Sequence, residues 1–210
     1  MLLKGMHVTS LPEQRAELLA GTLHTFLCPK CSAAIRVEIA TVYTDFDRSD
    51  YVAVEPIGTM LSMELRRFHQ GVFDRAFTLG PEVAQELGCS VRHRLVAGLP
   101  ALREKVMAWD AGLDDRVLEA TKADQQAQRG LRGEEWRLAR VLTGGHLVFA
   151  RLAPTSPTEE GCCVVPCRAH LGFHTVPRAI YERRLRDRAD IADAYPALMG
   201  SWVVDIADEI

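Results

Sequence analysis

The 210-residue chain has no apolar stretch that approaches the roughly 18 residues needed for a membrane-spanning helix. Residues 1–7 also lack the continuous apolar segment of a signal peptide. The sequence therefore predicts a cytoplasmic protein without a membrane anchor, in a compartment where thiols stay reduced. For the six cysteines, this favours a metal site or buried thiols over a disulfide framework.

A basic excess is missing as well, since 25 Lys and Arg residues stand against 28 Asp and Glu residues and the formal net charge is -3. Neutralising phosphates supplies most of the affinity of nucleic-acid binders, so we do not expect a nucleic-acid partner. The densest basic run holds Arg183, Arg184, Arg186 and Arg188. Because Asp187, Asp190 and Asp193 dilute this run, we interpret it as a solvated helix face.

Common catalytic signatures are also lacking. The chain has no Gly-rich phosphate loop, no nucleophile elbow and no His-Glu-x-x-His motif. Its composition, with 48% hydrophobic and 25% charged residues, is nevertheless that of an ordinary globular protein with enough apolar material for a core. These observations favour a folded, non-enzymatic protein.

The pattern of apolar residues alternates between helical and extended spacing, which predicts an α+β fold. We expect helices at 10–20, 60–76, 81–87, 100–111, from 114 onward, and at 177–194. We expect strands at 34–43, 51–56, 91–97, 134–142, 146–152, 162–166 and 202–206. The resulting architecture is a zinc-ribbon-like knuckle and β-hairpin joined to a mixed body of short antiparallel sheets and helices.

Local signals refine these elements. Gly88 is expected to stop the helix at 81–87, and Thr143-Gly144-Gly145 to join two strands as a hairpin. Residues 122–132 are polar and are interpreted as an exposed helix end or linker. In the helix at 177–194, one face should hold Tyr181, Leu185, Ala189 and Ala192.

Trp109 belongs to an apolar series at helical spacing, with Leu102 and Val106. We expect its helix to pack with the helix from 114 against the strand at 91–97 and to form the core of the larger body.

The most distinctive chemical feature is the sequence Cys28-Pro29-Lys30-Cys31. Two residues between cysteines allow both sulfur atoms to reach one tetrahedral metal ion, but structural zinc takes four protein ligands. The missing ligands are sought in residues 162–174, which hold Cys162, Cys163, Cys167, His170 and His174.

Four interpretations of the knuckle stay open: a vestigial turn without metal, a zinc site completed by residues 162–174, a site shared with another subunit or partner, and a redox-active pair. The redox interpretation is disfavoured, since residues 32–37 read as a strand rather than as a helix start that would lower a thiol pKa.

A second candidate region is rich in carboxylates, with Glu104 and Lys105 followed by Asp110, Asp114 and Asp115. Paired acids can hold Mg²⁺, although Asp114 and Asp115 are explained more simply as a helix cap with acids at the positive helix end.

Isolated residues are assigned simple roles. His69 and His93 are interpreted as structural or surface histidines, and Cys89 as a small buried residue. For His24, four residues before Cys28, support of metal ligands is a minor alternative.

Residues 7–56 resemble the latter half of the CpXC domain, a bacterial-type family. They hold a short helix, a glycine, an extended lead-in, the Cys-Pro-x-Cys turn and then Tyr43-Thr44-Asp45. Residues 94–119, with Leu-Arg-Glu-Lys at 102–105 and Gly-Leu-Asp-Asp at 112–115, resemble the segment that follows. Family domains typically begin with another Cys-Pro-x-Cys, which would lie upstream of His7 and is absent here.

The resemblance implies a fold more than a function, because the family has no assigned activity. We expect a CpXC-like domain at 1–130 and a C-terminal α+β segment at 131–210. The expected function is that of a non-enzymatic adaptor or regulatory protein that binds a protein partner, or a second copy of itself, with a structural zinc ion as the candidate cofactor. The alternative is a metal-dependent, hydrolase-like enzyme whose carboxylates or cysteines converge in the fold.

Overall fold

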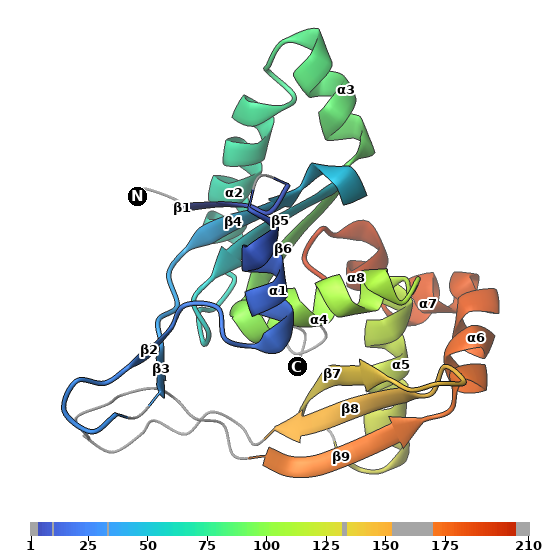
Figure 1. The fold of residues 1–210 in the computed structure, drawn as a ribbon. Coiled ribbons are helices and arrows are strands. Elements are labelled where there is room, and N and C mark those ends of the chain that lie inside the picture. The colour runs from blue at the N-terminus through green and yellow to red at the C-terminus, as the bar shows by residue number, and fades with distance from the viewer. Residues whose placement is uncertain (1–3, 10, 33, 132–133, 153–169, 205–210) are drawn as a thin grey trace. The chain divides into compact units, whose positions relative to one another are not determined.

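The computed structural model describes residues 4–9, 11–32, 34–131, 134–152 and 170–204 (Figure 1), with only the backbone described at Lys4 and His170. It is a mixed α+β structure with small sheets, which confirms the α+β class, but the expectation of antiparallel sheets alone is wrong, because one sheet contains two parallel strand pairings. The chain divides into two compact units, one of residues 1–23 and 38–102 and the other of residues 24–37 and 103–210. No helix of the described part is long and apolar enough to cross a membrane.

The first unit is built on a four-stranded sheet. Its elements are β1 (Lys4–His7), α1 (Pro12–Ala20), β4 (Thr41–Asp45), the 3-10 helix η1 (Phe46–Arg48), β5 (Asp50–Glu55), α2 (Met63–Ala76), α3 (Glu82–Ser90) and β6 (Arg92–Ala97). The strand order is β1-β4-β5-β6, with β4 and β5 antiparallel and both outer pairings parallel.

Both faces of this sheet are covered, which explains why every residue of β4 and β5 is buried. Tyr51 and Glu55 of β5 face α2, where Tyr51 packs against Phe73 and the Glu55 carboxylate contacts His69. Tyr43 and Asp45 of β4 lie on the opposite face, because successive side chains of a strand alternate. Asp45 contacts Arg15 of α1 there.

The second unit contains a two-stranded ribbon and a three-stranded antiparallel sheet. Its elements are β2 (Thr25–Leu27), β3 (Ala34–Arg36), α5 (Asp115–Gln128), β7 (Glu135–Val141), β8 (Leu147–Leu152), β9 (His170–Val176), α6 (Arg178–Arg186), α7 (Arg188–Ala194) and α8 (Pro196–Gly200). α4 (Leu99–Asp110) begins in the first unit and continues in the second. The expected boundary at residue 130 stays a prediction, since compactness does not show which part folds independently.

One cluster forms the core of the second unit. It joins Ala108 of α4 and Val117 and Leu118 of α5 to Trp136 of β7 and Phe149 of β8. Trp109 itself is buried, as its spacing predicted. Packing of these helices against the strand at 91–97 concerns the arrangement of the two units and stays a prediction.

The single strand expected at 34–43 is wrong, because this segment forms β3 and β4 in two different sheets. The Val37 amide donates to the His24 carbonyl at 2.9 Å and closes the β2–β3 ribbon. The Glu38 carboxylate then accepts a hydrogen bond from the Ile57 amide at 2.8 Å. These long-range bonds interrupt a run whose alternation is continuous in the sequence.

The predicted stop at Gly88 is also wrong, since α3 continues to Ser90. A Cβ atom at position 88 would lie 2.6 Å from Cβ of Phe77, so the glycine permits close packing rather than ending the helix. The hairpin at Gly144 and Gly145 is confirmed, and both residues have the positive φ that favours glycine.

The helix expected at 177–194 breaks at Asp187 into α6 and α7. The break changes which positions face inward: Tyr181 and Ile191 are buried, whereas Leu185, Ala189 and Ala192 are exposed. The predicted apolar face is therefore correct only for Tyr181 and wrong for the other three residues. The expected strand at 162–166 and residues 205–206 of the last strand lie outside the described residues, and residues 201–204 show only an isolated bridge at Val203.

The exposed linker expected at 122–132 is wrong for its first half. Lys122, Gln125 and Gln126 are buried in the last turns of α5. The Gln126 amide donates to the Glu134 carbonyl at 2.6 Å, and Lys122 has several charged partners. These polar side chains are buried because each has partners inside the unit.

Candidate functional site

Cys28 and Cys31 lie in the loop that joins β2 to β3. The two strands are antiparallel and pair Phe26 with Ile35, so the loop is the tip of a hairpin. The Ser32 amide donates to the Cys28 carbonyl at 2.8 Å and closes a tight turn, with Ser32 in the left-handed region at φ 56°. Cys28 is buried and Cys31 is exposed. The hairpin position of the two cysteines agrees with the sequence, while the relative direction of their sulfur atoms stays a prediction.

The structure does not show the zinc-ribbon form of this knuckle. Among the residues that the structure describes, no group of three or more His, Cys, Asp or Glu side chains could hold a metal ion. Cys162, Cys163 and Cys167 lie outside the described residues, and His170 opens β9 with its side chain likewise not described. The zinc site therefore stays a prediction.

Two further histidines bear on this site: His24 as a candidate neighbour of the metal and His174 as a candidate ligand. His24 lies at the base of the ribbon with a positive φ of 54°, and its carbonyl accepts the Val37 amide. His174 in β9 lies beside the Trp136 ring, with the centroids 4.8 Å apart, and burial lowers its pKa. Both contacts belong to the framework of the second unit, and a role of either histidine at a metal stays a prediction.

Two large apolar side chains, Phe26 and Leu27, directly precede the cysteine loop without being buried. Phe26 is 60% exposed and Leu27 is 71% exposed. Neighbouring strand residues point to opposite faces, so apolar surface is open on both faces of the ribbon. An isolated two-stranded hairpin is at best marginally stable in water. The ribbon therefore presents apolar surface that the described residues leave exposed.

The carboxylate-rich region separates into distinct roles. Asp114 is the N-cap of α5, since its carboxylate accepts from the Arg116 amide at 2.9 Å and the Val117 amide at 3.4 Å. The cap interpretation is therefore confirmed. Asp110 is exposed, whereas Glu104 and Asp115 are almost fully buried.

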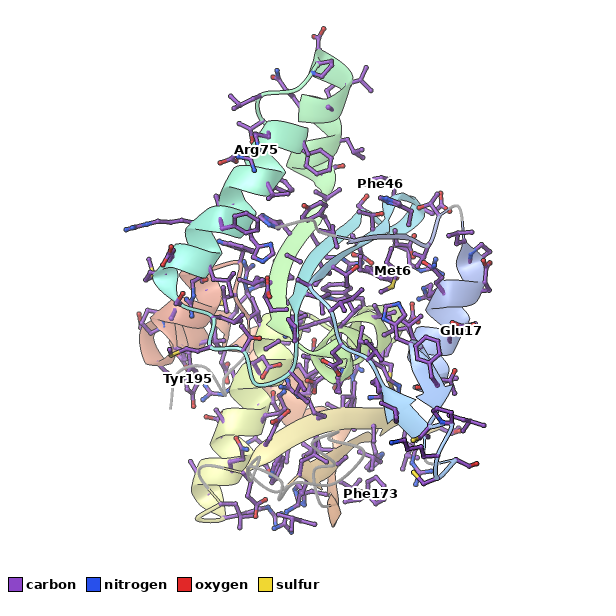
Figure 2. The ribbon with its side chains drawn as sticks, turned by 90° about the vertical axis from the view of Figure 1, so that its left-hand side faces the viewer. Met6, Glu17, Phe46, Arg75, Phe173 and Tyr195 are labelled. Carbon is purple, nitrogen blue, oxygen red and sulfur yellow. The ribbon has the colours of Figure 1, made fainter. Side chains whose placement is uncertain are left out.

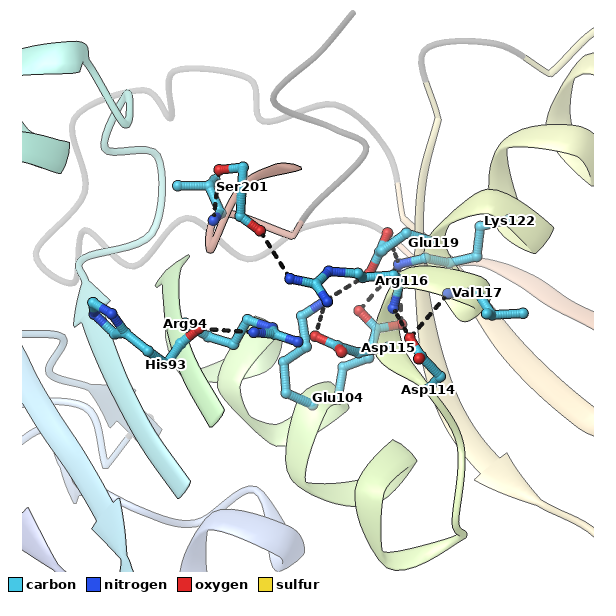
Figure 3. Close-up of polar contacts among 12 residues, drawn as sticks. His93, Arg94, Glu104, Asp114, Asp115, Arg116, Val117, Glu119, Lys122 and Ser201 are labelled. Carbon is cyan, nitrogen blue, oxygen red and sulfur yellow. Dashed lines mark hydrogen bonds and ion pairs between the residues drawn. The ribbon is translucent and has the colours of Figure 1, made fainter. Parts of the chain in front are cut away.

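Glu104 and Asp115 belong to a buried charge network formed by Glu104, Lys105, Asp115, Glu119, Lys122 and Arg137. Figure 3 labels four of its members, Glu104, Asp115, Glu119 and Lys122. At its centre, Lys122 Nζ lies 3.1 Å from both carboxylate oxygens of Glu104 and 2.8 Å from Glu119 Oε2. It also donates to the Trp136 carbonyl at 3.1 Å. The ammonium group is thus surrounded by acceptors.

The other members complete the charge balance. Lys105 Nζ lies 3.1 Å from Glu119 Oε1 and 3.6 Å from Asp115 Oδ2. Glu104 also accepts from Arg137 Nη1 at 3.1 Å and from the Leu138 amide at 2.6 Å.

The protonation of Glu104 follows from these partners. Burial alone would raise the pKa of Glu104, but the charges of Lys122, Arg137 and Lys105, together with the Leu138 amide, outweigh it and hold this pKa below its usual value. Glu104 is therefore engaged as a carboxylate by internal partners, which is the arrangement of a structural network.

Sequence reasoning found Glu104, Lys105 and Asp115 but missed Glu119, Lys122 and Arg137. A signal was present in α5, where Asp115, Glu119 and Lys122 recur at helical spacing on the same side as Leu118. Charged residues on a predicted inward face indicate buried pairs.

The Tyr43-Thr44-Asp45 motif lies at the end of β4 in the first unit. The Tyr43 hydroxyl donates to Asp45 Oδ2 at 3.4 Å, and Arg15 and Arg48 contact the same oxygen at 3.5 and 3.4 Å. Burial raises the pKa of Tyr43, so its hydroxyl stays a donor. The motif ties α1 and η1 to the sheet.

Asp50 is paired with Asp45 across the β4–β5 turn and is buried. Burial raises its pKa to about 6, although Arg92 Nε lies 2.7 Å from Asp50 Oδ1 and opposes the shift. Its charge is therefore only partly compensated.

Two histidines of the first unit, His69 and His93, have structural contacts on the α2 side of the sheet. His69 is buried, and its Nε2 lies 2.5 Å from Glu55 Oε1. His93 stacks on Phe73 with the ring centroids 4.0 Å apart. Burial, with a smaller contribution from Arg94, lowers the pKa of His93 to about 4. The buried assignment of Cys89 is wrong, since this residue lies on the exposed side of α3.

Comparisons with known proteins add one finding. The model of the family described as CpXC protein matches residues 4–122, which is more than half of the chain. The match includes the cysteine loop, the Tyr-x-Asp motif and most of α5. No curated protein and no solved structure matches the chain.

Proposed function

The chain belongs to the CpXC protein family, and on this premise we propose that it is a non-enzymatic adaptor that binds a protein partner through the β2–β3 ribbon. The observation that carries the proposal is the exposure of Phe26 and Leu27 beside the cysteine loop. Large exposed aromatic and aliphatic side chains are typical anchors of protein interfaces.

The ribbon has a second property that suits partner binding. It is a two-stranded sheet, so the outer edges of β2 and β3 carry backbone groups that are not paired within that sheet. A segment of a partner can add to such an edge by backbone hydrogen bonds, while its side chains contact exposed apolar residues. Phe26 and Leu27 supply those residues on the two faces of the ribbon.

A structural zinc ion at Cys28 and Cys31 is part of this proposal. Tetrahedral zinc would fix the loop and hold the apolar residues in one orientation. The buried position of Cys28 and the closed turn at Ser32 are compatible with that role.

The hydrolase-like alternative lacks a supporting observation in the described structure. Glu104, its central carboxylate, is saturated by Lys122, Arg137 and the Leu138 amide, and Asp114 is engaged as a helix cap. We therefore put forward the adaptor function alone.

Site-specific photocrosslinking in the native cell tests the proposal. A photoreactive phenylalanine analogue at Phe26 should crosslink to a defined partner protein, and Leu27→Ser should reduce the yield severalfold. The matched control is the same analogue at Met60, which is an exposed apolar residue of the first unit. The partner should be absent from the control. Crosslinks at position 26 that match those at position 60, or no crosslinks at all, would contradict the proposal.

A further inference from the structure

α2 and α3 form a helical hairpin that extends from the four-stranded sheet of the first unit (Figure 1). The inner side of α2 is fixed by His69 and Phe73, which are buried against the sheet. α3 is attached more lightly: Leu87 packs on the aromatic cluster of Phe73 and Phe77, but no residue of α3 is buried. The outer sides of both helices therefore face solvent.

The two outer sides carry opposite charges. On α2, Arg67 and Arg75 are exposed two turns apart, and Figure 2 shows the Arg75 side chain on the outer side of the helix. On α3, Glu82 and Glu86 are exposed one turn apart. Within the described part of the chain, none of these four side chains makes a hydrogen bond or an ion pair. Glu64 adds an acid in the first turn of α2, at the opposite end from Arg75.

A glycine lies between the two arginines on the outer side of α2. A Cβ atom at Gly71 would meet only Arg75 Nη1, at an ordinary contact distance of 3.7 Å. Glycine inside a helix is less stable than alanine because it loses more backbone freedom on folding. Since no contact among the described residues requires glycine here, close approach of another backbone would account for it.

The connection between the helices exposes two apolar side chains. Leu79 is 75% exposed and Val83, one helical turn later, is 76% exposed. Together with the opposite charges, they give this hairpin the composition of a small interface: an apolar centre with charges around it.

We propose that a second copy of this chain docks on the α2–α3 hairpin, with the basic side of α2 in one copy against the acidic side of α3 in the other. A reciprocal arrangement of this kind is an isologous dimer, in which each patch is used once per copy. Leu79 and Val83 of both copies supply the apolar contact, and Gly71 allows the facing helix to approach. This inference goes beyond the adaptor function and uses no residue of the β2–β3 ribbon.

Sedimentation velocity of the full chain from roughly 1 to 300 µM measures this association directly. We expect a monomer–dimer equilibrium that weakens as salt is raised, because exposed charges are screened. Reversal of the basic side by Arg67→Glu with Arg75→Glu should raise the Kd about tenfold or more. Reversal of the acidic side by Glu82→Arg with Glu86→Arg should do the same.

The decisive experiment is to mix the two charge-reversed proteins. Each alone repels its own copy, whereas the mixture restores opposite charges at both contacts and should form a heterodimer. A wild-type chain that stays monomeric throughout, reversed variants that associate as the wild type does, or a mixture that stays monomeric would each overturn the proposal.

Uncharged substitutions distinguish docking from a folding defect. Gly71→Ala should raise the melting temperature of the monomer, because it improves helix propensity in open space, and should weaken association. Leu79→Ser should weaken association with little change in melting temperature. Phe26→Ser with Leu27→Ser should leave association unchanged, so loss of the dimer in this control would move the interface to the ribbon and overturn the proposal.

Discussion

The two units bury charged side chains in different ways. In the second unit, Lys122 lies between Glu104 and Glu119, and each buried charge has opposite charges within contact distance. In the first unit, Asp50 is buried and His93 is half-buried, both with weaker compensation, and desolvation shifts the pKa of each in the direction that favours its neutral form. A buried group with opposite charges in contact stays ionised, whereas burial with weak compensation favours the neutral form of the group. The stability of the second unit should therefore respond most to loss of a partner, whereas in the first unit the separate contributions of Asp50 and His93 should change with pH.

The largest expected effect is the loss of Lys122. Lys122→Met removes the cation shared by Glu104 and Glu119 and leaves excess buried negative charge. Breaking a buried ion pair on one side costs about 3–5 kcal/mol, so urea unfolding of this variant should show a decrease of that order. Arg183→Met, an exposed cation of the same unit, is the matched control and should change stability by at most about 0.5 kcal/mol.

A triple variant tests whether the excess buried charge causes the loss of stability. Adding Glu104→Gln and Glu119→Gln to Lys122→Met removes the excess charge, so part of the lost stability should return. A small loss in Lys122→Met, below about 1 kcal/mol, would contradict the view that the network is tightly coupled.

A smaller effect is expected from acid in the first unit, where two groups act in opposite directions. The pKa of His93 is about 4 in the folded chain against an ordinary value of 6.5, so the unfolded chain binds the proton first as the pH falls from 6.5 to 4. His93 therefore removes stability as the pH falls. The pKa of Asp50 is about 6 when folded against an ordinary value of 3.8, so the folded chain holds more protons between pH 3.8 and 6. Asp50 therefore adds stability as the pH falls.

Single substitutions should separate these contributions, each of which is at most about 3 kcal/mol. His93→Phe leaves Asp50 alone, so stability relative to the wild type should improve as the pH falls from 6.5 to 4. Asp50→Asn should have the opposite effect over pH 6 to 3.8. The measurement is the unfolding free energy in urea at several pH values. Both variants keep the neighbouring ionisable groups unchanged. These groups are Arg92, Asp45 and Arg48 around Asp50, and Arg94, Asp74 and His69 around His93. If the unfolding free energy of the wild type and of both variants depended on pH in the same way, the two units would not differ in how burial affects ionisation.

The difference between features set by neighbouring residues and features set by long-range partners explains what the sequence could and could not predict. Local rules located the helix at Pro12–Ala20, the glycine hairpin at 144–145 and the cap at Asp114, because each depends on neighbouring residues. They failed at Lys122, which looks like part of a polar helix end until Glu104 of another helix is placed beside it. Long-range partners decide whether a charge is buried, and a single sequence does not show them.

The candidate site shows the same limit. The Cys-Pro-x-Cys spacing predicted a hairpin loop, and residues 28–31 lie in one. The exposure of Phe26 and Leu27 was not predicted, since apolar residues in a short strand normally indicate a core position. Alternation along residues 34–43 also concealed the transition from the ribbon to the large sheet, which depends on bonds from Val37 and to Glu38.

The smallest expected effect tests an intermediate case, a charge that is partly exposed and whose partners are mostly local. Asp114 accepts from two amides of the first turn of α5, and its Oδ2 lies 2.7 Å from Arg188 Nη2. Asp114→Ala removes both functions and should cost about 1 kcal/mol, the usual value of an N-cap. Asp114→Ser keeps a capping oxygen and loses the ion pair, which is exposed on the Arg188 side and contributes little. Chemical denaturation should therefore place the Ser variant close to the wild type. An equal loss in both variants would instead assign the stability to the ion pair, and the second unit would then depend on partly exposed charges as well as buried ones.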